Sequence, residues 1–147
     1  MEDTNLLRVY EAKMKPFRDI RQCSFNSHNF YHGGLTEDIY EEGLKWELEQ
    51  LGYVVCQQEE FHISYKGHEL DKTKRMDLVV KTESVGNIVL ELKALNAIDD
   101  KQRHQLFGYL RLLNWKYGML INFSLNGVYT EIWEYINDKN KFERVII

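Results

Sequence analysis

Apolar residues recur every three to five positions between residues 36 and 51, a spacing that predicts an amphipathic helix. Thr36 suits the N-cap position of this helix, and Gly52 suits the position just beyond its end. Four acidic residues lie near its start, where the positive end of the helix dipole favours them: Glu37, Asp38, Glu41 and Glu42. The sequence therefore predicts a capped helix whose first turns are acidic.

Short runs rich in Val, Ile and Leu follow this helix, as is typical of strands. The predicted strands cover residues 53–65, 76–81, 87–94 and 117–123. Apolar repeats over 99–113 predict a second helix before the last of these strands. Because a strand, helix, strand connection is normally a right-handed crossover, residues 117–123 should lie parallel to an earlier strand in a mixed sheet. The tail, residues 128–136 and 142–147, predicts a further pair of strands.

The beginning of the chain has the weakest pattern. Apolar residues between 6 and 14 favour a short helix that would end before Pro16. Residues 23–33 have the character of a loop. No element is firmly predicted before residue 33.

Composition indicates one folded domain. The chain has 147 residues, of which 44% are hydrophobic and one is proline, so we expect a single domain over residues 1–147. Its N-terminus lacks a secretory pattern, and no run approaches the roughly 20 apolar residues that a membrane span needs. Cys23 and Cys56 fit neither a disulfide framework nor a zinc site. These features favour an intracellular protein, of cytoplasm or nucleus, in a reducing compartment.

The formal net charge of −4 argues mildly against a nucleic-acid partner. An enzyme that held two divalent cations would gain four positive charges, which removes most of this objection. Local basic groups also occur, although such groups are more often ordinary solvated surface. They are Lys72, Lys74, Arg75, Lys101, Arg103 and His104.

The turn between residues 76–81 and 87–94 suggests a reactive site. If it centres on Ser84, Val79 lies opposite Val89 and Asp77 lies opposite Glu91. Facing side chains are about 5 Å apart, so two carboxylates there repel and need a reason. A hard cation such as Mg²⁺ or Mn²⁺ would provide one.

Lys93 shares the face of Glu91, because side chains two apart on a strand point the same way. The opposite face would be continuously apolar: Met76, Leu78, Val80, Ile88, Leu90 and Leu92. Two alternatives remain open. The three charged residues could form ordinary cross-strand ion pairs, or a register slip of one residue could separate the two acids.

Five segments together resemble a known family. Residues 34–40, GLTEDIY, match the pattern GxxExxY, and residues 76–80 and 91–94 resemble the two halves of the PD-(D/E)XK motif. Residues 105–109 are similar to the QxxxY helix motif of RecB-like nucleases, and residues 118–123 to the final strand of the fold. The chain thus resembles the GxxExxY family of the PD-(D/E)XK nuclease superfamily.

This resemblance implies an α/β fold with a restriction-endonuclease-like αβββαβ core, a mixed sheet flanked by helices. The core would cover about residues 33–123, with residues 1–32 and a C-terminal β extension, 124–147, as peripheral additions. Met76 stands where the motif name has Pro, a difference that affects the turn rather than the chemistry.

The resemblance also implies roles for individual residues. Asp77 and Glu91 would bind Mg²⁺ or Mn²⁺, together with the backbone carbonyl of Leu92. Lys93 would orient or help to deprotonate the attacking water. Glu37 would be the acid from the first predicted helix, with Glu41 one turn later as a rival.

Gln105 and Tyr109 lie four apart, on one face of the second predicted helix, and would brace the site or contact the nucleic acid. Simpler alternatives exist for two of the candidates. Tyr109 could be a core residue, and Glu37 could merely complement the helix dipole. His62, His68 and His104 lack metal-ligand spacing.

Two functions follow as hypotheses. The first is a metal-dependent nuclease that hydrolyses phosphodiester bonds of nucleic acid, with DNA favoured over RNA. The second is a weakly active or inactive nuclease-fold subunit that binds or assembles with a partner. The aromatic tail (Tyr129, Trp133 and Tyr135) favours the second, because exposed strands with aromatic residues often pair with another chain or a second copy.

Overall fold

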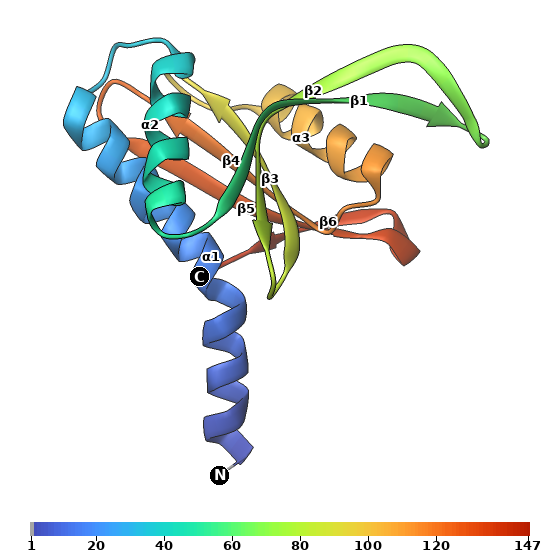
Figure 1. Cartoon of the computed structure of the whole chain (residues 1–147), viewed down its shortest axis with the longest axis horizontal. Helices are drawn as coiled ribbons and strands as arrows, with labels where there is room; N and C mark the ends of the chain where they lie inside the picture. The colour runs from blue at the N-terminus through green and yellow to red at the C-terminus, as the bar shows by residue number, and fades with distance from the viewer. Residues whose placement is uncertain (1) are drawn as a thin grey trace.

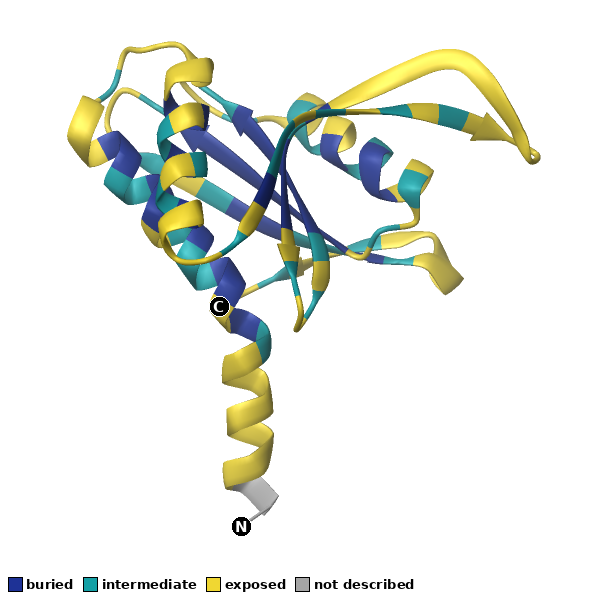
Figure 2. Cartoon of the chain, viewed as in Figure 1, coloured by how far each residue is buried: buried dark blue, intermediate teal, exposed yellow. Residues whose placement is uncertain are grey.

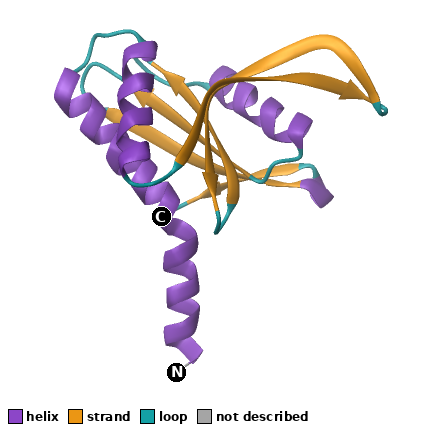
Figure 3. Ribbon diagram, viewed as in Figure 1, coloured by secondary structure: helices purple, strands orange, loops and turns teal. Residues whose placement is uncertain are grey.

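The computed structural model describes residues 2–147, with side chains from Thr4 onward. It contains one six-stranded sheet in the order β1-β2-β3-β4-β5-β6, flanked by helices (Figure 1). The helices are α1 (Glu2–Tyr31), α2 (Glu37–Gln50) and α3 (Asp100–Leu113), with a short 3₁₀ turn, η1 (Asn137–Lys139). The strands are β1 (Val54–Tyr65), β2 (His68–Thr82), β3 (Gly86–Lys93), β4 (Tyr117–Phe123), β5 (Val128–Ile136) and β6 (Lys141–Val145). The predicted order of helix, three strands, helix and strand is confirmed, with β5 and β6 as the C-terminal extension (Figure 3).

The sheet separates two hydrophobic layers. On one face α1 and α2 pack over side chains such as Leu78, Leu90 and Met119. On the other face α3 packs over Val79 and Val89. Buried residues follow the centre of the sheet and the inner sides of the helices (Figure 2). Within residues 2–147, no helix is long and apolar enough to cross a membrane.

The hairpin register is confirmed. Val79 pairs with Val89 and Leu78 with Leu90, as a turn centred on Ser84 requires. The predicted parallel crossover is also present, since β3 runs parallel to β4 with Glu91 beside Leu120. These pairings place Asp77 and Glu91 just beyond the last paired positions of β2 and β3.

Residues 6–14 are helical, as their apolar pattern favoured, but the expected end of this helix before Pro16 and the loop over residues 23–31 were wrong. Helix α1 passes through Pro16 and continues over residues 23–31, where the sequence suggested a loop. Proline in a helix interior costs about 3 kcal/mol. Burial of Phe17 and Ile20 in the core of the protein offsets that cost.

The second half of α1 was misread because its buried face is polar. Ser27 donates to the backbone oxygen of Tyr40, and the His28 ring contacts the backbone oxygen of Ser124 at 2.7 Å. These contacts satisfy buried polar groups, which an apolar pattern does not reveal.

Met76 lies on the α3 face of the sheet, although we expected it on the face of Leu78. The alternation of β2 breaks at Asp77. Opposite this position, Gln58 of β1 has a left-handed backbone with φ of 51°. Beyond it, β1 and β2 continue as an exposed arm that projects from the body (Figures 1 and 2).

The C-terminal aromatic residues are less exposed than expected. Tyr135 is only 8% exposed, and its ring stacks on Phe142 with centroids 4.8 Å apart. Phe107 of α3 lies between Phe142, at 4.1 Å, and Trp133, at 4.9 Å. Most of this aromatic surface therefore joins β5 and β6 to α3, and Tyr129 alone of the three predicted residues is classed as exposed.

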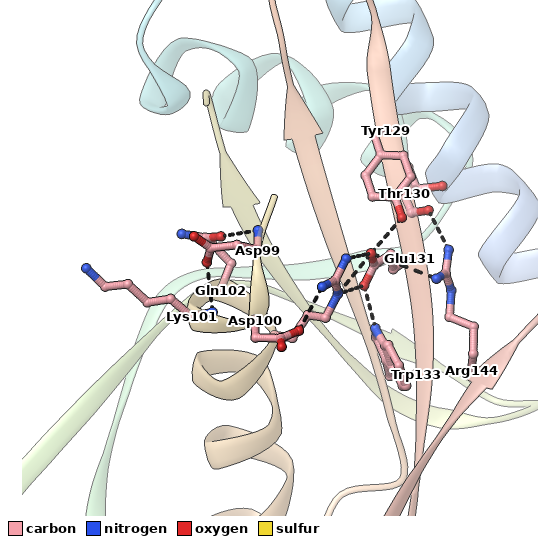
Figure 4. Close-up of polar contacts among 10 residues, drawn as sticks. Asp99, Asp100, Lys101, Gln102, Tyr129, Thr130, Glu131, Trp133 and Arg144 are labelled. Atoms are coloured by element: carbon pink, nitrogen blue, oxygen red, sulfur yellow. Dashed lines mark hydrogen bonds and ion pairs between the residues drawn. The ribbon is translucent and has the colours of Figure 1, made fainter. Parts of the chain in front are cut away.

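A buried carboxylate joins α3 to β5. Glu131 accepts hydrogen bonds from Arg103, Tyr129 and Trp133, at 2.7 Å for the Arg103 Nη2 atom and 2.6 Å for the Tyr129 hydroxyl (Figure 4). Arg144 approaches the same carboxylate at 3.8 Å. Although burial alone would raise the pKa of Glu131, these partners lower it to about 2. The positive charge of Arg103 is therefore balanced by Glu131 within the fold.

Helix α3 begins with a capping box. Lys101 donates its backbone N–H to the Asp99 side chain, and Asp99 donates its own to the side chain of Gln102, each at 2.8 Å (Figure 4). This pair of contacts fixes the start of the helix that carries Gln105 and Tyr109.

We expect Glu131→Gln to lower the free energy of unfolding by about 2 kcal/mol, because the amide cannot replace a charge-assisted bond to Arg103. Urea denaturation at pH 7 measures the change. The matched control is Glu134→Gln, on the same strand, whose carboxylate contacts Lys116 at 3.5 Å near solvent. A loss of equal size in the control would contradict a special role for Glu131.

Candidate active site

Asp77 lies where β2 separates from β3. The backbone N–H of Leu92 donates to its Oδ2 atom at 2.8 Å, so a side chain replaces the next bond of the strand pairing. The side chain of Gln58 approaches the other oxygen, Oδ1, at 3.5 Å. Burial raises the pKa of Asp77, while the Leu92 bond and the charge of Lys93 oppose the rise. The acid is thus held rigidly between the two strands.

Glu91 is almost completely buried, with 2% of its surface exposed. Its Oε1 atom contacts the Nζ atom of Lys93 at 3.1 Å. Its Oε2 atom is buried and has no hydrogen-bond partner among the described residues. Burial, reinforced by the charge of Asp77, raises the pKa of Glu91 to about 8 despite the attraction of Lys93. A buried carboxylate oxygen without a hydrogen-bond partner destabilises the fold unless another group, such as a cation, binds it.

A chain of hydrogen bonds leads from this lysine into α3. Lys93 donates to the side-chain oxygen of Gln105 at 3.0 Å, and Gln105 donates to the hydroxyl of Tyr109 at 3.1 Å. Tyr109 is also buried, and its ring packs edge to face on Phe61. The two alternatives for Tyr109 are therefore compatible, since it is a core residue and a member of this chain.

The two acids of α2 differ in their surroundings. Both oxygens of Glu41 are occupied, by Gln57 at 2.7 Å and by Gln58 at 2.8 Å. No donor of residues 2–147 forms a hydrogen bond to the exposed carboxylate of Glu37. Desolvation raises the pKa of Glu37, the charge of Lys93 lowers it and that of Asp77 raises it again. Glu37 is therefore close to the other site residues and free to bind.

The start of α2 is anchored by Tyr40. Its ring is buried and stacks on Phe123 with centroids 4.7 Å apart, and its hydroxyl donates to the backbone oxygen of His32. Gly34 has a φ of 100°, a conformation that glycine adopts readily. The glycine turn and the buried tyrosine together fix the direction in which Glu37 leaves the helix.

Sequence reasoning missed Gln57 and Gln58. These residues join Glu41 to the site, and Gln58 adopts its left-handed backbone at the break in β2. Strained conformations of this kind cluster at functional sites. A run of four consecutive polar residues, 57–60, within the strand is the signal that the sequence offers.

The residues present fit a hard cation. The donors are carboxylate oxygens, and Glu91 contributes a buried oxygen that has no hydrogen-bond partner in the described part of the chain. Within residues 2–147, no three His, Cys, Asp or Glu side chains are grouped closely enough to hold an ion alone. Mg²⁺ suits such a site, because it usually keeps several waters and needs only one or two carboxylates.

Comparisons with a family model and with a solved structure show what the chain resembles. The model of the family described as the PD-(D/E)XK nuclease superfamily matches residues 15–133. The crystal structure of SSO0001 aligns with a TM-score of 0.51 at 20% identity, over 65% of this chain and 48% of that one. This chain therefore spans about half the length of that protein, and the likeness concerns the fold. Among curated proteins there is no match.

Proposed function

Since the chain belongs to the PD-(D/E)XK nuclease superfamily, we propose that it is a metal-dependent nuclease that hydrolyses phosphodiester bonds, with DNA favoured over RNA. One observation carries this proposal. Glu91 is buried beside Lys93 and within the field of Asp77, and one of its oxygens has no partner in the described chain. A purely structural acid would be expected to have both oxygens satisfied.

Asp77 and Glu91 would hold Mg²⁺ or Mn²⁺, with the backbone carbonyl of Leu92 as a further ligand, and Glu37 would approach the same ion from α2. When bound, the ion lowers the pKa of a coordinated water and stabilises negative charge on the phosphate. Glu37 is preferred to Glu41 because Gln57 and Gln58 already occupy the second carboxylate.

Lys93 would orient the attacking water and donate to the phosphate oxygens. Attack forms a new P–O bond, the bond to the departing sugar oxygen breaks, and that oxygen takes up a proton. Gln105 and Tyr109 would act as positioning residues, since their hydrogen bonds hold the lysine amine. Rigid support of this kind is what places a charge accurately in a transition state.

Exposed basic residues would bind the nucleic-acid backbone. Two of the predicted basic residues are already paired, Arg75 with Glu60 and Arg103 with Glu131. The others are exposed at the surface: Lys72 and Lys74 on the arm, and Lys101 and His104 on α3.

We also infer membership of the GxxExxY branch, which the arrangement of Gly34, Glu37 and Tyr40 supports, and a single functional domain over residues 1–147.

A binding or assembly subunit is the second candidate. It draws support from β6, whose outer edge has no neighbouring strand in the described sheet and offers a surface for a partner or a second copy. The aromatic residues nearby are largely used inside the fold. The complete set of two acids and a lysine favours the enzyme.

The experiment is a cleavage assay on supercoiled plasmid, single-stranded DNA and RNA, each with Mg²⁺, Mn²⁺ or chelator. We expect cleavage that requires a divalent ion and prefers DNA. Absence of cleavage on all substrates with either ion would favour the assembly subunit.

We expect Glu37→Gln to lower the single-turnover rate about tenfold, because a metal-binding charge is lost. This corresponds to an activation barrier about 1.4 kcal/mol higher. Glu41→Gln should change the rate less than threefold, since that carboxylate serves Gln57 and Gln58. Rates measured at saturating Mg²⁺ compare the two variants. A larger loss for Glu41→Gln would reverse the assignment.

A further inference from the structure

A groove of about 430 Å³ lies between the C-terminal half of α1 and the middle of α2. These two helices run side by side on the outer side of the sheet (Figure 1). None of the residues that line the groove belongs to the candidate active site. Its lining suggests a second binding function that does not depend on nuclease activity.

Three aromatic side chains line this groove, and all are unusually exposed. Phe30 is 78% exposed, Trp46 60% and Tyr31 42%. The rings of Phe30 and Tyr31 are perpendicular, with centroids 5.0 Å apart. Aromatic faces carry partial negative charge, which attracts cations. Such a group of exposed rings also marks an interaction surface rather than ordinary solvent-facing residues.

Two carboxylates line the same groove. Glu42 accepts a hydrogen bond at 2.8 Å from the neutral amide of Gln57, and Glu47 is the second acid. Within residues 2–147, neither acid forms an ion pair, whereas Glu49 on the next turn is paired with Lys45 at 3.2 Å. The groove therefore carries uncompensated negative charge, which disfavours phosphate and nucleic acid.

The helices approach closely at the bottom of the groove. A Cβ atom placed on Gly43 would lie 2.7 Å from the Ser27 hydroxyl oxygen. That hydroxyl already donates to the backbone oxygen of Tyr40, at 3.3 Å. The strongest acceptors in the groove are consequently the two carboxylates.

We propose that this groove binds a cationic side chain, preferably arginine, from a basic segment of a partner protein. A planar guanidinium stacks on aromatic rings and donates several hydrogen bonds at once to carboxylates. The aliphatic stem of the same side chain covers apolar surface. The aromatic rings of the groove match the guanidinium plane and the stem of arginine, and the two acids without ion pairs match its charge.

The test uses the full chain and N-acetyl-arginine amide as the probe. Resonances of the tryptophan indole N–H groups are followed by NMR as the probe is added to 100 mM. We expect a saturable shift of Trp46, and no comparable shift of Trp115 or Trp133. N-acetyl-norleucine amide, which has a similar stem without charge, should have at least tenfold weaker effect.

Variants separate the cationic site from a simple apolar patch. Glu42→Gln/Glu47→Gln should weaken probe binding at least tenfold, and Glu49→Gln should leave it unchanged. Equal binding of the norleucine probe, or no saturable shift at Trp46, would overturn the proposal. A Trp46 shift that depends on protein concentration without probe would assign the groove to a second copy and would also overturn it.

Discussion

We expect the Lys93→Ala protein to fold normally and to cleave nucleic acid roughly 100- to 1,000-fold more slowly than the wild type. The lysine amine lies between Glu91 Oε1, at 3.1 Å, and Gln105, at 3.0 Å, and 19% of its side chain is exposed. Its loss removes the positive charge that would stabilise the reacting phosphate. Folding should be little affected, because the neighbouring Glu91 has a pKa of about 8 and is mostly neutral at pH 7 without metal.

Single-turnover cleavage and a thermal melt of each variant provide the measurement. Lys81→Ala is the matched control, since Lys81 is exposed near the opposite end of β2. Gln105→Ala should give a smaller loss, because it only positions the amine. Full activity of Lys93→Ala would show that Lys93 is not needed for cleavage and would remove the basis for placing the nuclease activity at this site.

The second large effect concerns the stability of the metal-free protein. Glu91 has a pKa of about 8 in the folded state, well above the ordinary value of 4.5. Between these two values the folded state binds a proton that the unfolded state does not. The free energy of unfolding therefore falls as pH rises, by about 1.4 kcal/mol per pH unit.

Glu91→Gln removes this titration. In chelator, we expect the variant to exceed the wild type in stability by roughly 3 kcal/mol at pH 7, with the difference growing up to about pH 8. Urea denaturation at pH 5, 6, 7 and 8 measures the trend. Glu83→Gln, in the exposed turn between β2 and β3, is the control. A wild type that is more stable than the variant at pH 7 would indicate that Glu91 serves a structural ion pair.

Metal should reduce this difference by about half. With a dissociation constant of about 1 mM, 10 mM Mg²⁺ would stabilise the wild type by about 1.4 kcal/mol, or roughly 3 °C in melting temperature. Glu91→Gln should gain much less. An equal gain in both proteins would place the ion elsewhere.

The hairpin shows how much local sequence predicts. Alternation and a turn centred on Ser84 were sufficient to bring Val79 opposite Val89, and therefore to bring Asp77 near Glu91. The i,i+4 spacing was sufficient to place Gln105 beside Tyr109. These features depend on short stretches of chain, where periodicity and register determine which side chains meet.

Features that depend on distant partners could not be predicted in this way. The helix through Pro16 forms because the sheet covers its buried face, and the sheet comes later in the chain. The left-handed backbone of Gln58 and the shift of Met76 arise where β1 meets the break in β2. Likewise, only the fold reveals that Glu41 is occupied and Glu37 free.

The position of α1 also bears on protein synthesis. Phe17 packs edge to face on Tyr117, with ring centroids 5.2 Å apart, although the strand that carries Tyr117 is made much later. At ordinary translation rates of about 5–20 residues per second, the ribosome needs roughly 5–20 s to reach it. Throughout that time the apolar face of α1 lacks the surface that finally covers it. Completion of this layer must therefore wait for the second half of the chain, and chaperones that bind nascent chains have a defined segment to protect.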